Sequence, residues 1–366
     1  MLSRLRDAIG GPDAAAAADA QRHLDGLTKP PGSLGRLEEL AVRLAALTGH
    51  PPRVTRPVIF TFAADHGVVA EGVSAYPQSV TAQMVENFAR GGAAVNALAR
   101  HVGARVVVAN FGVAAELGDC AGVLPRAIGP GTRSITKGPA MSRDEALRAI
   151  AEGAALVEGT ALDCVGTGEM GIGNTTAASA LTAALTGADP AMVTGRGTGV
   201  ADEVWVGKVE AVRRALAVNR LDSTDALGVL SGVGGFEIAG LVGVVLAGAA
   251  RRVPVVLDGF IAGAAALVAA RLAPAARNYM IAAHRSAEPG HVRVLEALGL
   301  TPYLELGMRL GEGTGAALGI GLLRAALACY RETASSNRPR SARRLVLARL
   351  VLACPITADA PTRRLP

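Results

Sequence analysis

The run Pro57-Val-Ile-Phe-Thr-Phe-Ala63 is apolar apart from one threonine, and Asp65-His66-Gly67 follows it almost at once. Four similar runs lie further along the chain, at residues 104–110, 161–166, 253–258 and 279–283. Patterns typical of helices separate these runs. Buried strands that alternate with helices form a parallel sheet with helices on both faces. The sequence therefore predicts an α/β fold with a doubly wound, mostly parallel sheet.

Helical patterns fill the intervals between the runs and also the beginning of the chain. Those in the intervals cover residues 79–102, 142–158, 175–186, 208–219, 236–250 and 259–272. Before the first run, residues 14–18 and 33–48 have the pattern of helices, and Lys29-Pro-Pro-Gly32 forms a break between them. We therefore expect residues 1–50 to form a small helical subdomain, which can include part of the C-terminal segment. Residues 51–328 are expected to form the large α/β domain.

Composition excludes several classes of protein. Half of the 366 residues are hydrophobic and 19% are charged, which is too apolar for a disordered chain. The longest stretch without charged or strongly polar side chains has 13 residues, at 238–250, whereas a helix needs about 20 residues to span a bilayer. The chain also reaches Asp7 before any apolar signal segment forms. We expect a cytoplasmic protein that does not enter a membrane.

The positive charge is concentrated at the C-terminal end. The net charge is +6 and the isoelectric point is near 9.5. From Arg331 onward there are eight arginines against Glu332 and Asp359, so the rest of the chain is neutral. Eleven aromatic residues also offer few surfaces for stacking bases, and we expect no nucleic-acid partner. We interpret residues 331–366 as a loosely ordered, arginine-rich tail, with binding to anionic surfaces as the alternative.

The cysteines do not indicate a metal site. Cys120, Cys164, Cys329 and Cys354 are scattered singly and never form a Cys-x-x-Cys pair. This distribution favours reduced, partly buried thiols over a zinc site or a disulfide framework.

Polar or glycine residues follow each strand run. They are Asp65-His66-Gly67, Asn110-Phe-Gly112, Gly166-Thr-Gly-Glu169, Asp258-Gly259 and His284-Arg-Ser286. In open α/β sheets the ligand binds outside the carboxyl ends of the strands. One such residue alone is more often a helix cap or a turn residue, but five groups in succession predict the lining of a pocket.

One glycine-rich segment has the spacing of a nucleotide-binding loop. Gly166-Thr-Gly168-Glu-Met-Gly171 follows a strand run, and Ile-Gly173-Asn174 leads into a helix. Glycines let the backbone approach a phosphate, and the N–H groups of the helix start attract it. Glu169 would place a carboxylate where a pyrophosphate lies, and Asp189 sits in a turn rather than at a ribose-binding position. The segment therefore favours a mononucleotide with Glu169 near its sugar or leaving group; the alternative is an ordinary glycine-rich turn.

Two more features allow both a functional and a structural interpretation. Lys208 could supply a positive charge to a phosphate, near the glycines of 195–199, or it could simply be solvated. Glu312 lies between Gly311 and Gly313 before an apolar helix. It is either a cap of that helix or a base that glycines bring close to a ligand.

Several ordered motifs resemble those of the nicotinate-nucleotide dimethylbenzimidazole phosphoribosyltransferase family. They are Lys29-Pro-Pro-Gly-Ser-Leu-Gly-Arg-Leu-Glu38, Ala64-Asp-His-Gly-Val68, Val73-Ser-Ala-Tyr-Pro-Gln-Ser-Val-Thr-Ala-Gln-Met84, Gly168-Glu-Met-Gly-Ile-Gly-Asn-Thr-Thr176, Gly234-Gly-Phe-Glu-Ile-Ala-Gly240, Leu257-Asp-Gly-Phe260, Ser286-Ala-Glu-Pro-Gly-His291 and Met308-Arg-Leu-Gly-Glu-Gly-Thr-Gly-Ala-Ala-Leu318. They keep their order over most of the chain. The arginine-rich segment after Tyr330 does not resemble the short helix that usually ends this family.

The resemblance implies an enzyme of cobalamin biosynthesis. It would transfer the phosphoribosyl group of nicotinate mononucleotide to 5,6-dimethylbenzimidazole, releasing nicotinate and forming α-ribazole 5′-phosphate. The resemblance further implies a cytoplasmic homodimer with a Rossmann-like large domain and no metal or redox cofactor. Two alternatives stay open: a nucleotide-cofactor (NAD-type) oxidoreductase and a non-catalytic nucleotide-binding protein.

The resemblance also assigns roles to residues. Glu312 would remove the benzimidazole proton, and Glu169 would stabilise positive charge on the ribose. The benzimidazole would lie by Ser74, Tyr76, Gln83 and Met84. The nucleotide and its phosphate would be held by Gly171, Asn174, Thr175, Gly197, Lys208, Asp258, Gly259 and Ser286.

Overall fold

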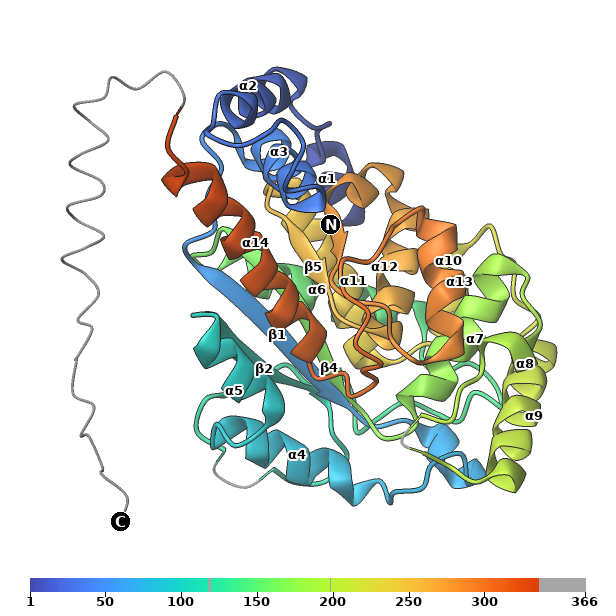
Figure 1. The fold of residues 1–366 in the computed structure, drawn as a ribbon. Helices are drawn as coiled ribbons and strands as arrows, with labels where there is room; N and C mark the ends of the chain where they lie inside the picture. The colour runs from blue at the N-terminus through green and yellow to red at the C-terminus, as the bar shows by residue number, and fades with distance from the viewer. Residues whose placement is uncertain (118–119, 198, 336–366) are drawn as a thin grey trace, which may run out of the picture.

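The computed structural model describes residues 1–117, 120–197 and 199–335, and a parallel sheet forms their centre (Figure 1). Its strands are β1 (Pro57–Ala64), β2 (Arg105–Gly112), β3 (Val123–Pro125), β4 (Cys164–Met170), β5 (Val255–Leu257) and β6 (Met280–Ala282). Every pair is parallel, and the order is β3-β2-β1-β4-β5-β6. The order reverses between β1 and β4, as in a Rossmann-like sheet. The predicted fold class is confirmed.

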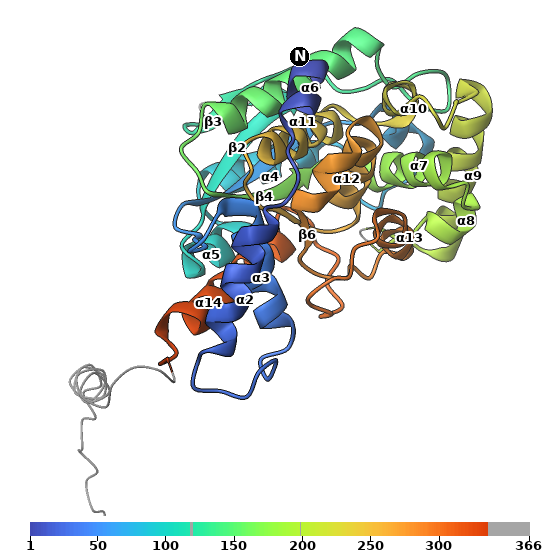
Figure 2. The ribbon, with the colours of Figure 1, turned by 90° about the horizontal axis from the view of Figure 1, so that it is seen from above.

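Helices cover both faces of this sheet. The helices are α1 (Leu2–Ala8), α2 (Ala14–Asp25), α3 (Arg36–Thr48), α4 (Ser79–Ala89), α5 (Ala94–His101), α6 (Arg143–Glu158), α7 (Asn174–Thr186), α8 (Pro190–Val193), α9 (Asp202–Asn219), α10 (Ala226–Val233), α11 (Phe236–Ala250), α12 (Phe260–Leu272), α13 (Pro289–Leu298) and α14 (Thr314–Glu332), with 3-10 turns η1 (Gly67–Glu71) and η2 (Pro274–Tyr279). Figure 2 shows α6 and α11 on one side of the sheet and α5 and α14 on the other. Each face has its own cluster of buried apolar side chains.

The packing of α6 on α11 depends on glycine. A Cβ atom at Gly153 would lie 2.0 Å from the carbonyl oxygen of Gly240, and one at Gly243 would lie 2.0 Å from that of Ile150. Side chains at these positions would push the helices apart. The helix layer can therefore pack closely, and α11 is buried nearly along its whole length.

The N-terminal helices pack in two places. Helices α2 and α3 form a small apolar cluster with Tyr330 from the end of α14. The chain after α14 stays with them, because the N–H of Thr28 donates to the carbonyl of Ala334 at 2.8 Å. Helix α1 instead buries Leu5 in the cluster around α11. The division at residue 50 stays a prediction. The loosely ordered tail was predicted from residue 331, but α14 continues to Glu332 and Ala334 pairs with Thr28, so the prediction was wrong for residues 331–335. Residues 336–366 of the predicted tail lie outside the described residues.

Three local predictions were wrong. The helix predicted at 79–102 is divided into α4 and α5, because Gly91 adopts a φ of +74° between them. The first half of the glycine-rich segment belongs to strand β4, so Glu169 lies in a strand rather than in a loop. Strand β3 was not predicted, because its three residues are too short to show a pattern.

The described ranges offer neither a membrane-spanning helix nor a metal cluster. None of their helices is both long and apolar enough to cross a membrane. They contain no group of three or more His, Cys, Asp or Glu side chains placed to hold a metal ion. Cys120, Cys164 and Cys329 are free thiols, and Cys354 lies outside the described residues.

Candidate active site

A small cavity of about 90 Å³ lies at the carboxyl ends of the central strands. Its walls come from the end of β4, the start of α7, the segment around Gly197 and the segment before α14. The residues that line it are Glu169, Met170, Gly171, Ile172, Asn174, Thr175, Gly197, Gly259, Phe260, Ile261, His284, Ser286, Glu288, Arg309, Leu310 and Gly311. The tertiary structure thus brings together seven of the predicted site residues, which the sequence spreads over more than a hundred positions.

Glu169 is the carboxylate inside this cavity. It is 6% exposed, and one of its oxygens accepts a hydrogen bond from the amide of Asn174. Burial, together with the negative charges of Asp258 and Glu237, raises the pKa of Glu169 to about 8. Gly311 lies opposite Glu169 and leaves no room for a side chain, because a Cβ atom there would lie 2.5 Å from Glu169 Oε1.

Glu312 is the second buried carboxylate. It has a φ of 66°, a left-handed conformation that costs a residue with a side chain about 1 to 2 kcal/mol. Its backbone carbonyl accepts a hydrogen bond from Thr61 Oγ1 at 2.9 Å, which ties this turn to β1. Burial and the charge of Asp258 raise the pKa of Glu312 to about 7. Glu312 does not line the 90 Å³ cavity; the backbone N–H of Val95, at the start of α5, acts on its carboxylate and opposes the rise in pKa.

Asp258 caps a helix in this structure, and its predicted contact with the nucleotide stays a prediction. Its carboxylate accepts hydrogen bonds from the N–H groups of Gly313 at 2.9 Å, Gly315 at 2.6 Å and Ala316 at 3.3 Å. It therefore caps α14, where the helix dipole favours a negative charge. Asp258 does not line the 90 Å³ cavity. Asp258 instead anchors the turn that carries Glu312.

Lys208 lies behind the cavity wall. It is 1% exposed, and its Nζ donates to Thr175 Oγ1 at 2.7 Å. Burial lowers the pKa of Lys208 to about 8, and the nearby charge of Glu288 opposes this change. Thr175 lies in the first turn of α7, where the helix dipole favours an anion. Lys208 thus contacts the first turn of α7 through Thr175, and its role toward a phosphate stays a prediction.

The four residues predicted to bind the benzimidazole lie apart from this cavity. Ser74 and Tyr76 are in the segment before α4, and Gln83 and Met84 are in α4. Tyr76 is 51% exposed, and its N–H donates to Ser74 Oγ at 3.2 Å. None of the four lines the cavity around Glu169. Their binding role stays a prediction.

Two charged cavity residues were not predicted as site residues. Arg309 donates from Nη1 to the carbonyl of Gly197 at 2.7 Å, and Glu288 accepts from the N–H of Gly197 at 2.9 Å. Both lie inside motifs that carried the resemblance: Arg309 is two positions before Gly311, and Glu288 is two positions after Ser286. Their partner Gly197 is about a hundred positions away, so the sequence alone did not reveal the contact.

Comparisons with known proteins agree with this geometry. A family model described as a phosphoribosyltransferase matches residues 9–339. A nicotinate-nucleotide–dimethylbenzimidazole phosphoribosyltransferase from Roseiflexus sp. (strain RS-1) is 55% identical over 92% of this chain and 96% of its own. The chain belongs to this phosphoribosyltransferase family. The relative of the same name from Desulforudis audaxviator is 52% identical over the same shares of the two chains. The crystal structure of CobT from Thermus thermophilus has a TM-score of 0.84 and 49% identity, covering 88% of this chain and 97% of its own.

Membership of the phosphoribosyltransferase family settles the class of protein. The chain is an enzyme of the pentosyltransferase class, and the oxidoreductase and non-catalytic alternatives are not favoured. The family name describes a reaction between small molecules, in line with the predicted type of substrate.

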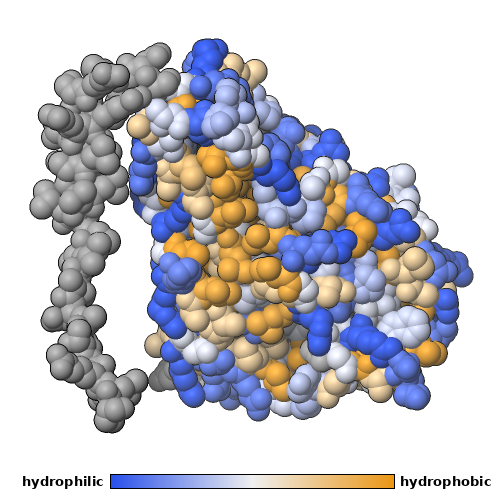
Figure 3. Space-filling view, in the orientation of Figure 1, coloured by the Kyte–Doolittle hydropathy of each residue, from blue (hydrophilic) through white to orange (hydrophobic). Residues whose placement is uncertain are grey.

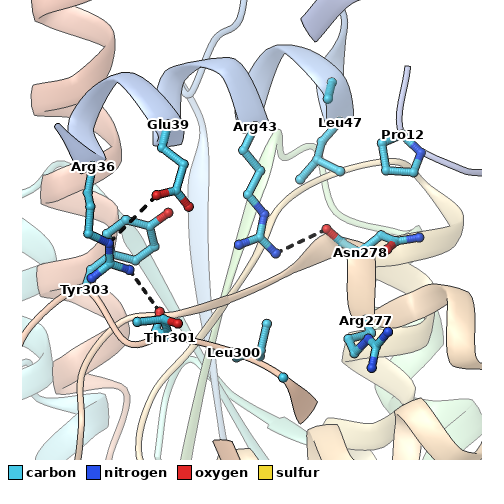
Figure 4. A pocket seen from close by; sticks show the side chains of 12 residues that line it. Pro12, Arg36, Glu39, Arg43, Leu47, Arg277, Asn278, Leu300, Thr301 and Tyr303 are labelled. Atoms are coloured by element: carbon cyan, nitrogen blue, oxygen red, sulfur yellow. Dashed lines mark hydrogen bonds and ion pairs between the residues drawn. The ribbon is translucent and has the colours of Figure 1, made fainter. Parts of the chain in front are cut away.

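Larger cavities exist away from the two buried carboxylates. One of about 500 Å³ lies between α3 and residues 299–303 (Figure 4). Two of its three arginines bind backbone carbonyls: Arg36 binds those of Thr301 and Pro302, and Arg43 binds those of Asn278 and Met280. These contacts join α3 to the segments at 278–280 and 301–302, which explains Arg36 and Arg43 structurally. A further cavity of about 490 Å³ adjoins the reaction cavity and shares Glu288 and Arg309 with it.

Proposed function

We propose that the enzyme transfers the phosphoribosyl group of nicotinate mononucleotide to 5,6-dimethylbenzimidazole, giving α-ribazole 5′-phosphate and nicotinate, in the assembly of the cobalamin nucleotide loop. The observation that carries the proposal is the pair of buried carboxylates: Glu169, which faces Gly311, and Glu312, which follows Gly311 in the chain. Both have pKa values raised by burial, to about 8 and about 7. Relatives that match over nine tenths of the chain carry the name of this reaction.

Glu312 is the proposed general base. As the benzimidazole nitrogen attacks C1′ of the ribose, the N–H on the other ring nitrogen becomes acidic and its proton moves to the carboxylate. A base whose pKa is about 7 is well matched to neutral pH. The bond from C1′ to the pyridinium nitrogen breaks at the same time, and its electron pair stays on nicotinate, which leaves without an acid.

Glu169 is the proposed stabiliser of positive charge. Nicotinate mononucleotide has a pyridinium cation, and a nearby cation favours the ionised form of a carboxylate. Binding would therefore release the proton of Glu169, and the resulting carboxylate would face the charge that develops on the ribose. Attack from one face and departure from the other inverts the configuration at C1′, which fits direct displacement.

The rest of the cavity is proposed to hold the nucleotide. Thr175 and Asn174, in the first turn of α7, would meet the phosphate, with Lys208 behind Thr175. Gly171, Gly197, Gly259 and Ser286 would form the surrounding wall, as their place in the cavity supports. Arg309 is the one arginine that lines this cavity among the described residues. Its guanidinium could therefore bind a second anionic group of the substrate.

We also propose that the enzyme is a cytoplasmic homodimer, as the resemblance implies. Figure 3 shows hydrophobic residues gathered across the face where Figure 1 places α14. Leu318 and Leu322 are half-buried there, and Ala325 and Ala328 are exposed one turn apart from each other. An apolar stripe of this kind is typical of an interface. Replacing Ala325 with Glu should lower the molar mass measured by light scattering to that of one chain; an unchanged mass would mean that α14 is not the interface.

The proposed reaction is tested by direct assay. The enzyme is mixed with nicotinate mononucleotide, with and without dimethylbenzimidazole, and free nicotinate is measured. We expect nicotinate release that depends on the base, with α-ribazole 5′-phosphate formed in equal amount. Tight retention of NAD without nicotinate release would instead favour the oxidoreductase alternative.

A further inference from the structure

A buried histidine and a buried glutamate contact each other beneath the turn that follows β4. His66 lies just after β1 and Glu237 lies in the first turn of α11. They are 1% and 0% exposed, and His66 Nε2 lies 2.7 Å from Glu237 Oε1. The other oxygen of Glu237 has no hydrogen-bond partner among the described residues. Neither side chain lines the reaction cavity, and the mechanism above uses neither.

Glycines bring this pair close to the cavity. A Cβ atom at Gly171, a cavity residue, would lie 3.3 Å from both Glu237 Oε1 and His66 Cδ2. A Cβ atom at Gly235 would lie 2.4 Å from His66 Cε1. The pair therefore supports the turn at Gly171 from below, at the meeting point of β1, β4 and α11.

Stability alone does not account for a buried histidine and a buried carboxylate at this position. Removing charges from water is costly, and apolar side chains of similar size often stabilise a core equally well. The carboxylate is held in the N-terminal turn of α11, where the helix dipole favours its negative charge. That charge acts on Glu169, because it contributes to the raised pKa of Glu169. Burial and the charge of Asp258 make larger contributions.

We propose that His66 and Glu237 are positioning residues, which hold the turn at Gly171 and place the buried carboxylate of Glu237 so that its charge acts on Glu169 until the pyridinium ring of the nucleotide binds. This inference rests on the proposed function, because that function requires Glu169 to ionise in the complex. His66 orients the Glu237 carboxylate by its hydrogen bond. The pair touches no substrate and acts through Glu169 and the turn.

Several other groups face Glu169 from the elements around it. They are Asn174 from α7, Asp258 after β5, His284 after β6, Glu288 before α13, and Arg309 and Glu312 before α14. Changing Asp258 would also release the cap of α14, and changing Glu312 would remove the proposed base. The charge of Glu237 can be removed without altering either, so it is the informative position.

The test is the pH dependence of kcat/KM for nicotinate release, from about pH 5 to about pH 10, in Glu237→Gln and His66→Gln. The Gln variant of Glu237 loses the charge, so the acidic limb governed by Glu169 should move to lower pH by about one unit. The Gln variant of His66 keeps the carboxylate, so its limb should stay in place or move to higher pH. If the pair were purely structural, both variants would have a lower melting temperature and the acidic limb of neither would move. That result would overturn the proposal.

A matched control and a second variant complete the experiment. Glu38, in α3, forms a buried ion pair at 2.8 Å with Lys29, in the segment between α2 and α3. Glu38→Gln should leave the acidic limb where it is in the wild type. If Glu237→Gln does not fold, Glu237→Asp keeps the charge and should retain the wild-type limb with a lower kcat; a displaced limb would contradict the proposal. Absence of nicotinate release by the wild type would overturn the proposed function itself, which is a separate outcome.

Discussion

Glu312 combines a strained structural position with a proposed chemical role. It is buried, it has a positive φ between two glycines, and burial and Asp258 raise its pKa to about 7. Such strain is retained where the surrounding structure requires it, and here hydrogen bonds to Thr61 and Asp258 hold the turn from both sides. A cap of α14 is supplied by Asp258, so Glu312 is free to act as a base.

Replacing Glu312 with Gln should therefore separate catalysis from folding. The amide keeps the size of the side chain but cannot accept the benzimidazole proton, so kcat should fall by roughly 10² to 10⁴. In the wild type, kcat should rise with pH through about 7, because the base must be deprotonated. Steady-state kinetics over pH and equilibrium binding of nicotinate mononucleotide measure these effects. Wild-type turnover in the variant would show that Glu312 is not the base.

Glu169 should reduce stability as the pH rises. Its pKa is raised from 4.5 to about 8 in the folded state, so between these values the folded protein holds a proton that the unfolded chain has released. The contribution of Glu169 to the free energy of unfolding is fully present below about pH 4.5 and is lost as the pH rises toward 8. Glu169→Gln should therefore increase the free energy of unfolding at pH 8, by on the order of 1 to 3 kcal/mol, and change it little at pH 4.5. Urea unfolding at the two pH values measures the difference; equal effects at both would contradict it.

At the scale of elements, the contact between α6 and α11 leaves no room for side chains at its glycines. Gly153→Ala would place a methyl group 2.0 Å from a backbone carbonyl of α11, which cannot move aside easily. We expect the free energy of unfolding to fall by about 1 to 3 kcal/mol or more. Gly207→Ala is the matched control, because Gly207 is an exposed helical glycine with open space around it. That variant should be stabilised by up to about 1 kcal/mol. Thermal unfolding of both variants provides the test, and equal losses would contradict the packing interpretation.

At the scale of the whole molecule, the C-terminal segment can be tested by truncation. Removing residues 336–366 lowers the formal net charge from +6 to zero and keeps the contact between Thr28 and Ala334. All proposed site residues precede this segment. We expect the truncated enzyme to fold and to retain most of its kcat, as measured by circular dichroism and nicotinate release. Loss of the folded state would show that the segment contributes packing to the N-terminal helices.

Local patterns determined much of the fold and part of the site. The apolar run at 57–63 became β1, and the pattern at 236–250 coincides with α11, because buried elements need continuous apolar side chains. Glu169 and Glu312 were recognisable because each stands among glycines, which admit a ligand close to the backbone. These features depend on neighbours in the sequence, and they can therefore be predicted from it.

Only the tertiary structure decided the contacts between distant segments. His66 and Glu237 are 171 positions apart, and Arg309 meets Gly197 across 112 positions. Asp258 follows a strand, as residues that line a pocket do. The structure shows that it caps α14, because the fold places three backbone N–H groups against its carboxylate. The elevated pKa values of Glu169 and Glu312 arise from burial and from carboxylates on other elements, which no local pattern reports. The sequence alone determined which residues could carry the chemistry, and the packing of the chain decided which of them meet and in what state of charge.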